Sequence, residues 1–307
     1  MNIVIYGTGG VGGYFGARLA QAGNNVTFIA RGKHLEAIQK NGLQLKSFKG
    51  NYLVNPVRAT SNFSEVQNID LVLICVKTWQ LKEVAKIINN NIGENSVIIS
   101  LLNGVENEDI LCSEISKNNV LGGLCKVVSK VEDYGVINHM SYEPTIVFGE
   151  LNINNSKRAV EIEQTFKKAG INAVLTNNIQ QEIWTKFLFI TTISAIGALT
   201  RVTIGEMLES DEVKGIMLKT AEEIVAVANA KGVPISKETI EKQFRVIESQ
   251  PYNTTASLQR DILEGKPSEL EAQNGTIVRL GKELGVPTPT NSFIYSCLLP
   301  QENNARL

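Results

Sequence analysis

The sequence has few histidines and cysteines and almost no net charge. Its 307 residues include 2 His and 4 Cys, and the formal net charge at pH 7 is −1. A charge so close to zero provides no general attraction to nucleic acid or to an anionic membrane. We therefore expect neither as a partner. The length suits two domains, and 43% hydrophobic residues are ordinary for a globular enzyme.

The sequence also has no spacing typical of a metal site, no disulfide pattern and no long apolar run. The cysteines and histidines are Cys75, Cys112, Cys125, Cys297, His34 and His139. Their separations match no common zinc or disulfide framework, so we expect no metal and a reducing compartment. Apolar runs such as Leu71 to Val76 are too short to cross a bilayer. Met1 leads directly into a strand, so we expect no signal peptide and a cytoplasmic location.

Glycine is concentrated at the start of the chain. Gly7, Gly9 and Gly12 follow the apolar segment 3–5 at G-x-G-x-x-G spacing, and a helical pattern and a second strand, 26–30, come next. Between a strand and a helix, this motif is the dinucleotide-binding fingerprint. Its glycines permit the tight turn, the approach to a pyrophosphate and helix packing. The predicted cofactor loop comprises Gly7, Thr8, Gly9, Gly10, Val11 and Gly12. The alternative is a glycine-rich turn that binds nothing.

The end of the second strand predicts which dinucleotide binds. NAD sites usually have an acidic residue there to hold the ribose 2′-hydroxyl. This sequence has Arg31 and Lys33 instead. A guanidinium is a bidentate partner for a 2′-phosphate, so we predict NADP(H), with Arg31 as the contact. Alternatively, both are ordinary surface cations.

The first half predicts an α/β fold. Continuous apolar runs at 70–76, 96–102 and 119–125 are typical of buried parallel strands. A helix is expected over 80–90. Shorter strands over 127–136 and 143–149, expected to be antiparallel, precede a helix over 156–170 and a strand over 171–175. We predict a Rossmann-type domain over residues 1–177.

The second half predicts an all-α domain over residues 178–307. Helices are expected over 183–199, 204–231, 236–249, 269–285 and about 290–299. The polar tail, 301–307, is expected to be disordered. A homodimer stays open, since an apolar helical domain can form an interface.

Four polar residues are candidates for chemistry. Lys77 and Asn103 each follow a predicted strand, where ligands of such sheets bind. Alternatively, they are a surface cation and a turn residue. Lys186 lies in an apolar helix, with its ammonium either in water or in a cleft where it could donate a proton. Ser268 resembles a helix N-cap, which would explain Glu269 in the first turn without any catalysis.

Taken together, these motifs resemble the ketopantoate reductase (2-dehydropantoate 2-reductase) family over nearly the whole chain. The matching segments are Gly7 to Gly13, Ala30 to Gly32, Val76 to Gln80, Leu102 to Glu106, Trp184 to Lys186 and Ser257 to Gly275. The last of these argues against the 6-phosphogluconate-type dehydrogenases, which share the architecture.

The resemblance implies an NADPH-dependent reductase of 2-oxo acids. It implies that Lys186 is the general acid and that Glu269 engages that lysine and the substrate hydroxyl. Ser257 would help to hold the substrate carboxylate, and Asn103 and Lys77 would lie near nicotinamide and substrate. These roles fit the chemistry, because an ammonium can stabilise and protonate the oxygen while hydride reaches the carbonyl carbon.

Two positions depart from the family pattern. Ile190 and Ser194 stand where the family usually has asparagines facing the substrate. Ketopantoate stays the leading substrate. Another branched or aromatic 2-oxo acid, and a non-catalytic NADP(H)-binding protein, are the alternatives.

Overall fold

In this computed structural model, residues 1–152 and 156–307 are described, and they form two compact units. The first unit comprises Met1–Leu102 and Glu106–Ile179, and the second comprises Asn103–Val105 and Gln180–Leu307. A single boundary after residue 177 therefore omits one feature. The short segment Asn103–Val105 groups by its contacts with the helical unit, although the chain on both sides of it belongs to the first.

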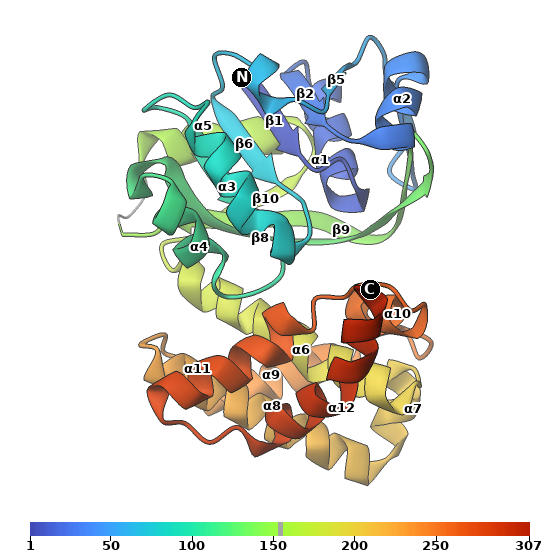
Figure 1. The fold of residues 1–307 in the computed structure, drawn as a ribbon, viewed down its shortest axis with the longest axis vertical. Helices are drawn as coiled ribbons and strands as arrows, with labels where there is room; N and C mark the ends of the chain where they lie inside the picture. The colour runs from blue at the N-terminus through green and yellow to red at the C-terminus, as the bar shows by residue number, and fades with distance from the viewer. Residues whose placement is uncertain (153–155) are drawn as a thin grey trace. The chain divides into compact units, whose positions relative to one another are not determined.

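The first unit is built on one ten-stranded sheet (Figure 1). Across the sheet the order is β4 (Tyr52–Val54), β3 (Leu43–Ser47), β9 (Val136–Glu150), β8 (Val120–Asp133), β7 (Val97–Ser100), β6 (Leu71–Ile74), β1 (Asn2–Tyr6), β2 (Asn25–Ile29) and β5 (Arg58–Thr60), with β10 (Asn172–Leu175) paired to β9. The strands from β8 to β5 pair in parallel. Both faces of β6 and β7 are buried, which explains their continuous apolar sequence.

Helices cover both faces of this sheet. On one face α1 (Gly10–Gln21) and α5 (Lys157–Lys168) bury Phe15 and Phe166 in the same cluster as Ile5, and α2 (Gly32–Asn41) adds Ile38. On the other face α3 (Leu81–Asn89) and α4 (Asn107–Glu114) bury Val84 and Leu111 in the same cluster as Val4. The neighbouring residues Val4 and Ile5 thus face opposite layers. This is the Rossmann-type arrangement that the sequence predicts.

The longest strands form one hairpin. β8 and β9 pair antiparallel from Leu121 opposite Glu150 to Asp133 opposite Val136. The sequence predicts separate shorter strands here, and only their antiparallel pairing is correct. Register shifts between Lys126 and Val128 interrupt the pattern without ending the strand, because a bulge disturbs side-chain alternation while the chain continues in the sheet.

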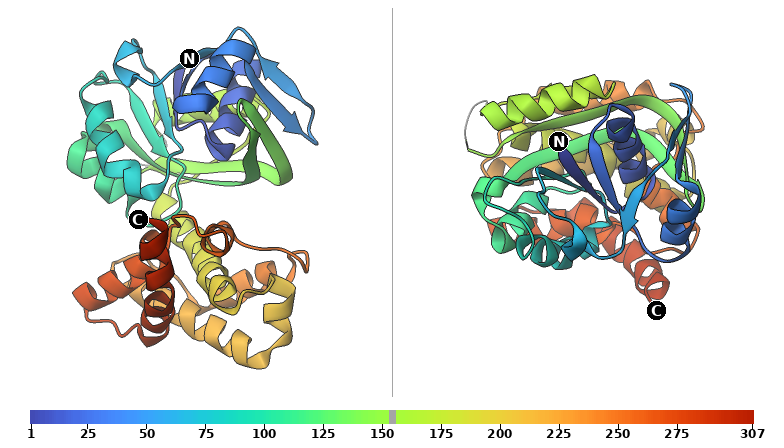
Figure 2. Two further views of the ribbon diagram at one scale, coloured as in Figure 1. Left: turned by 45° about the vertical axis from the view of Figure 1, so that its right-hand side comes forward. Right: turned by 90° about the horizontal axis from the view of Figure 1, so that it is seen from above.

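The second unit consists of helices in the part of the chain that is described (Figure 2). They are α6 (Ile179–Thr200), α7 (Ile204–Glu209), α8 (Asp211–Ala230), α9 (Lys237–Glu248), α10 (Ser257–Leu263), α11 (Thr276–Leu284) and α12 (Pro289–Ala305). α6 is long and apolar enough to cross a membrane, but 67% of its most apolar window is buried. Its residues Ile193 and Ile196 belong to the core of this unit, so α6 is a core helix.

Three details of this unit differ from the sequence-based expectation. The helix expected over 204–231 is broken at Ser210, whose hydroxyl accepts from Val213 N–H and begins α8. The helix expected over 269–285 starts as a π-helical turn, Glu271–Gly275, before α11. The tail expected to be disordered is helical to Ala305, and Glu302 within it is buried. Local polarity was misleading there because Glu302 is bonded to a distant segment.

Candidate functional site

The glycine-rich loop connects β1 to α1, and two of its glycines have no room for a side chain. Gly7 has φ +100°, and a Cβ there would lie 2.8 Å from the carbonyl oxygen of Cys75. A Cβ on Gly12 would lie 2.1 Å from the carbonyl oxygen of Gly7. These glycines are therefore required by the packing of the loop itself.

Gly9 differs from both, because a Cβ there would meet nothing within 4 Å. Gly9 is the N-cap of α1, and no side chain caps this helix or places an acid in its first turn. Uncapped N–H groups at a helix N-terminus attract anions. The open space above Gly9 therefore fits the pyrophosphate of a dinucleotide.

The other loop residues hold the loop in place. The hydroxyl of Thr8 donates to the carbonyl of Ile29 at 3.0 Å, so it fastens the loop to the end of β2. A Cβ on Gly10 would lie 2.3 Å from the carbonyl oxygen of Ser129 in β8. Val11 is partly buried and packs against the core under α1. These side chains position the loop rather than face open space.

His34, which the sequence patterns do not single out for this loop, also holds it. Its Nε2 lies 2.8 Å from the carbonyl oxygen of Thr8, and the N–H of Gly135 donates to its Nδ1 at 3.1 Å. Because Gly135 can only donate, the network assigns the proton to Nε2. Burial lowers the pKa of His34, which favours this neutral ring. Its one sequence signal is its place three residues after Arg31, in the first turn of α2.

Arg31 and Lys77 follow β2 and β6, the two strands that flank β1. Arg31 is the exposed N-cap of α2. It lies near Tyr6, where burial raises the pKa of the phenol and Arg31 partly opposes that rise. Lys77 is exposed, and its Nζ lies 5.8 Å from the centre of the Trp79 ring. Both cations thus lie at the same edge of the sheet as the glycine-rich loop, where a dinucleotide is expected.

In the helical unit, three predicted residues form one hydrogen-bonded chain. Lys186 Nζ donates to Asn103 Oδ1 at 2.9 Å, and Asn103 Nδ2 donates to Glu269 Oε2 at 3.0 Å. Glu269 is buried, and the other two are half-buried. Asn103 therefore lies between Lys186 and Glu269, and bonds at both ends fix the orientation of its amide.

The remaining predicted substrate residues lie near this chain in sequence, and within the described part of the molecule no hydrogen bond links them to it. Ser194 is buried, and its hydroxyl donates to the carbonyl of Ile190 within α6, a common bond for a serine inside a helix. Ile190 is half-buried. Ser257 is the exposed first residue of α10, a helix whose Leu258 packs in the same core as Ile193. Among the described residues, no hydrogen bond joins Ser257 to the Lys186–Asn103–Glu269 chain.

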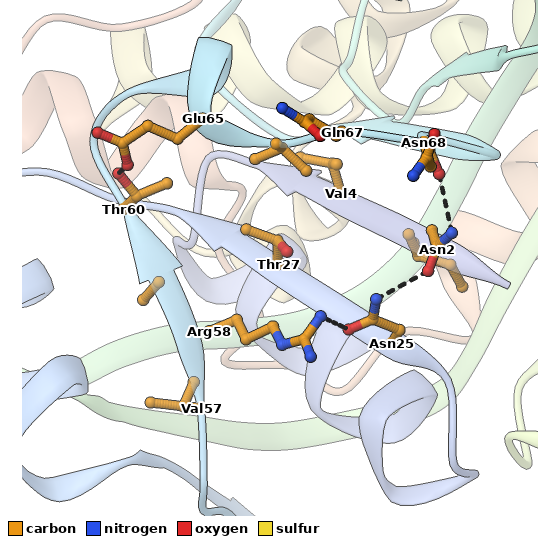
Figure 3. A pocket seen from close by; sticks show the side chains of 13 residues that line it. Asn2, Val4, Asn25, Thr27, Val57, Arg58, Thr60, Glu65, Gln67 and Asn68 are labelled. Atoms are coloured by element: carbon orange, nitrogen blue, oxygen red, sulfur yellow. Dashed lines mark hydrogen bonds between the residues drawn. The ribbon is translucent and has the colours of Figure 1, made fainter.

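A polar pocket of about 570 Å³ lies elsewhere on the first unit. Figure 3 shows its lining at the amino ends of β1, β2 and β5, where Arg58 donates to Asn25, Asn25 to Asn2, and Asn2 to Asn68. This is the sheet edge opposite the glycine-rich loop. The pocket contains none of the predicted site residues, so volume alone does not locate the chemistry. Within the described ranges, no group of His, Cys, Asp and Glu side chains could hold a metal ion.

Comparison with known proteins agrees with this geometry. Residues 3–152 match the family described as ketopantoate reductase PanE/ApbA, and residues 178–302 match its C-terminal part. The chain is 33% identical to the uncharacterized oxidoreductase YkpB of Bacillus subtilis, with 97% of this chain and 98% of that protein covered. It is 31% identical to the 2-dehydropantoate 2-reductase of Archaeoglobus fulgidus, with 96% of each covered.

A solved structure extends the likeness to three dimensions. The PanE/ApbA family ketopantoate reductase from Ralstonia eutropha JMP134 superposes with a TM-score of 0.92 at 30% identity and covers 100% of both chains. The family matches together span both units, and each unit has the fold that its motifs predict. The chain belongs to the ketopantoate reductase PanE/ApbA family.

Proposed function

We propose that this protein reduces a 2-oxo acid to the 2-hydroxy acid with NADPH, and that 2-dehydropantoate is its leading substrate. Membership of the family makes the chain an oxidoreductase that reduces 2-oxo acids with a nicotinamide dinucleotide. One observation carries the proposal: the hydrogen-bonded chain Lys186–Asn103–Glu269. It supplies an ammonium held at a defined position, which is what protonation of a carbonyl oxygen requires.

The proposed reaction needs one hydride and one proton. A bound nicotinamide would supply the hydride to C2 of the substrate. As negative charge develops on the carbonyl oxygen, Lys186 Nζ stabilises it and transfers a proton, which leaves the neutral amine and the hydroxyl of the product. Asn103 holds Lys186 through its Oδ1, while Glu269 holds Asn103 through its Nδ2. Glu269 thereby sets which end of the amide faces the lysine.

The glycine-rich loop supports a dinucleotide cofactor, and Arg31 supports one that carries a 2′-phosphate. Gly9 leaves open space at the uncapped start of α1, and Arg31 is exposed at the end of β2. We expect Arg31→Ala to lower kcat/KM with NADPH by about 10- to 100-fold, because it removes one or two charge-assisted hydrogen bonds to the 2′-phosphate. The value of kcat/KM with NADH, which has no 2′-phosphate, should be unchanged. Lys40→Ala, at the far end of α2, is the control. Equal efficiency of the native protein with both cofactors would refute the choice of NADPH.

A second substrate class is favoured by one specific observation. Ile190 has no hydrogen-bonding group, and the Ser194 hydroxyl is bonded to the Ile190 carbonyl. A pocket that lacks polar partners loses discrimination for a substrate hydroxyl. A more apolar branched or aromatic 2-oxo acid is therefore the second candidate. Replacing Ile190 with Asn should not raise kcat/KM for such a substrate. A large rise in kcat/KM for ketopantoate would instead favour the first candidate.

The deciding assay is NADPH oxidation at 340 nm with ketopantoate, 2-oxoisovalerate, phenylglyoxylate and pyruvate. Turnover of ketopantoate at about 10⁴ M⁻¹s⁻¹ or better, the lower range of working enzymes, supports the leading substrate. Lys186→Ala should abolish turnover and keep NADPH binding. Tight NADPH binding by the native protein with no turnover of any acid would favour a non-catalytic binding protein. We propose a cytoplasmic location on the lack of a disulfide pattern in the sequence.

A further inference from the structure

The last turn of α12 is bonded to the residue that directly precedes Glu269. The carboxylate of Glu302 accepts from the Ser268 N–H at 3.2 Å and 3.0 Å and also from the Ser268 hydroxyl. Arg306 Nε donates to Glu302 Oε1 at 2.7 Å, and Arg306 Nη2 donates to the Ser268 carbonyl at 3.0 Å. We call these three residues the Ser268 anchor. Every polar group of Ser268 takes part in it or in the bond from Leu270 N–H to the Ser268 hydroxyl.

Two further bonds join α12 to the segment that follows Glu269. Tyr295 donates to Glu271 Oε2 at 2.7 Å, and Asn274 Nδ2 donates to Asn291 Oδ1 at 3.0 Å. Burial and the bond to Glu271 raise the pKa of Tyr295 to about 12, so it remains a donor at neutral pH. Residues spaced by four and by seven lie on one face of a helix. One face of α12 therefore holds this segment at three points.

Glu269 lies between these attachments, just before a π-helical turn, and its carbonyl accepts from the Gln273 N–H at 3.0 Å. The chain becomes π-helical only at Glu271, and Leu270, which follows Glu269, is fully buried. The N–H groups of the first helical residues have no partner within the helix, so contacts from outside help to fix the main chain there. The side chain of Glu269 can then point in one direction, toward Asn103 Nδ2.

The chemistry of the anchor favours positioning over simple packing. Glu302 is 4% exposed, and burying a carboxylate costs free energy unless donors satisfy it. Apolar side chains would cover the same surface without that cost. A fully bonded carboxylate, however, allows only one arrangement of its donors. Such a network defines a position more closely than apolar contacts do.

We propose that Glu302 and Arg306 are positioning residues that set the place of Glu269 and, through Asn103, of the Lys186 ammonium. The inference rests on the proposed function, because it assigns these residues to the same proton transfer. It also gives the C-terminal turn of the chain a part in catalysis, although neither residue belongs to the hydrogen-bonded chain itself.

The test compares four variants with the native protein. Glu302→Gln keeps the shape but turns an amide N–H₂ toward donors. Arg306→Ala removes the charged partner from a partly exposed position, where folding is expected to survive. Arg306→Lys restores the charge. Arg279→Ala is the matched control, because it removes an arginine from another Arg/Glu pair four residues apart, on the exposed surface of α11.

We expect Glu302→Gln and Arg306→Ala to lower kcat about tenfold, since small misplacements in a proton-transfer site are costly. KM and Kd for NADPH should stay within about twofold, Arg306→Lys should recover much of the loss, and Arg279→Ala should match the native protein. Hydrogen exchange at the Ser268 and Leu270 amides should rise in the first two variants only. This second measurement does not require turnover.

Each other outcome has a defined meaning. Faster exchange with native kcat would overturn the positioning role, because the anchor would then be only structural. Unchanged exchange would overturn the anchor itself. If the native protein and Lys186→Ala are equally inactive with every 2-oxo acid, the proposed function fails and the positioning role of the anchor fails with it. The exchange data would then still report separately on the contact.

Discussion

The two units build their parts of the candidate site by different means. In the first unit the loop depends on glycines, which have no side chain: Gly7 and Gly12 have no room for a Cβ, and Gly9 leaves open space. In the second unit the site depends on side chains that are present. Asn103, Lys186 and Glu269 are brought together across 83 and 166 residues of sequence.

This difference determines what a substitution does in each unit. A methyl group added to the loop would clash with backbone atoms at Gly12 but would enter open space at Gly9. Replacing a polar side chain in the Lys186–Asn103–Glu269 chain causes no clash with the backbone. It removes a hydrogen bond or the proton donor instead. The first unit should therefore show effects on folding or cofactor affinity, and the second should show effects on kcat.

The largest contrast lies within the loop, between Gly12→Ala and Gly9→Ala. A Cβ on Gly12 would lie 2.1 Å from Gly7 O, so we expect a loss of about 4 kcal/mol or more in unfolding free energy. Gly9 has φ −82°, which alanine adopts readily. Gly9→Ala should keep the native Tm or raise it slightly while weakening NADPH binding at least tenfold, since its methyl fills the space expected for pyrophosphate.

Calorimetry and NADPH titration of both variants check this contrast. Gly23→Ala is unsuitable as a control because Gly23 has φ +84°. Gly215→Ala suits the purpose, since a Cβ there meets nothing within 4 Å and the residue lies in α8, in the other unit. If Gly9→Ala binds NADPH as tightly as the native protein, the phosphate site does not lie over Gly9.

The same contrast explains which features the sequence could predict. The loop, α1 and β2 lie within thirty residues, so glycine spacing and apolar periodicity were enough to locate them. The buried strands β6 and β7 were equally clear. No local pattern, by contrast, joins Lys186 to Asn103 or Glu269. Their roles came from the family resemblance, and helical spacing alone allowed Lys186 to be a surface residue.

The differences between the expected and the observed elements have three separate origins. The tail beyond residue 300 looked disordered because its polar residues have no local partner, yet Glu302 is bonded to Ser268, 34 residues earlier. The β8–β9 hairpin looked fragmented because bulges disturb its alternation. The start of α8 was missed, although Ser210 followed by two acidic residues is a typical N-cap signal. Only this last error could have been avoided from local sequence.

Glu269→Gln sharpens the comparison from the side of the second unit. The glutamine oxygen can still accept from Asn103 Nδ2, so the fold should be retained, but the negative charge that orders the chain is lost. We expect kcat to fall about 10- to 100-fold, at or below the roughly 100-fold lower end for proton-transfer groups, because Glu269 acts on Lys186 through Asn103. NADPH affinity should be unchanged. Steady-state kinetics and fluorescence titration of NADPH separate the two effects. A variant that loses cofactor binding in proportion to kcat would place Glu269 at the cofactor instead.

Glu108 tests whether side chains in the first unit act mainly on stability. It is buried in α4, its Oε2 has no partner among the described residues, and burial raises the pKa of its carboxyl from 4.5 to about 7. A raised pKa means that the protonated form favours folding, so the contribution of Glu108 is complete below pH 4.5 and is lost as pH rises through 7. Glu108→Gln should therefore increase the unfolding free energy by about 2 kcal/mol at pH 8 and change it little at pH 5. Denaturant unfolding at the two pH values measures this. Equal effects at both pH values would mean that folding does not raise the pKa of Glu108.

The smallest expected effect concerns His34, and it runs in the opposite direction. Burial lowers the pKa of this imidazole below 6.5, so its contribution to stability is complete above pH 6.5 and is lost as pH falls through the folded-state pKa. Protonation would turn Nδ1–H toward the Gly135 N–H and remove one bond that holds the loop, about 0.5–1 kcal/mol. His139, whose pKa is lowered in the same way, adds to this dependence of the unfolding free energy on pH, whereas Glu108 opposes it.

The measurement is therefore made in the Glu108→Gln background, with and without His34→Gln, by denaturant unfolding between pH 5 and 8. The acid-side loss should become smaller without His34 but should not vanish, because His139 remains. A slope that is unchanged without His34 would assign all of it to His139 and would leave the glycine-rich loop held by Thr8 and the backbone alone.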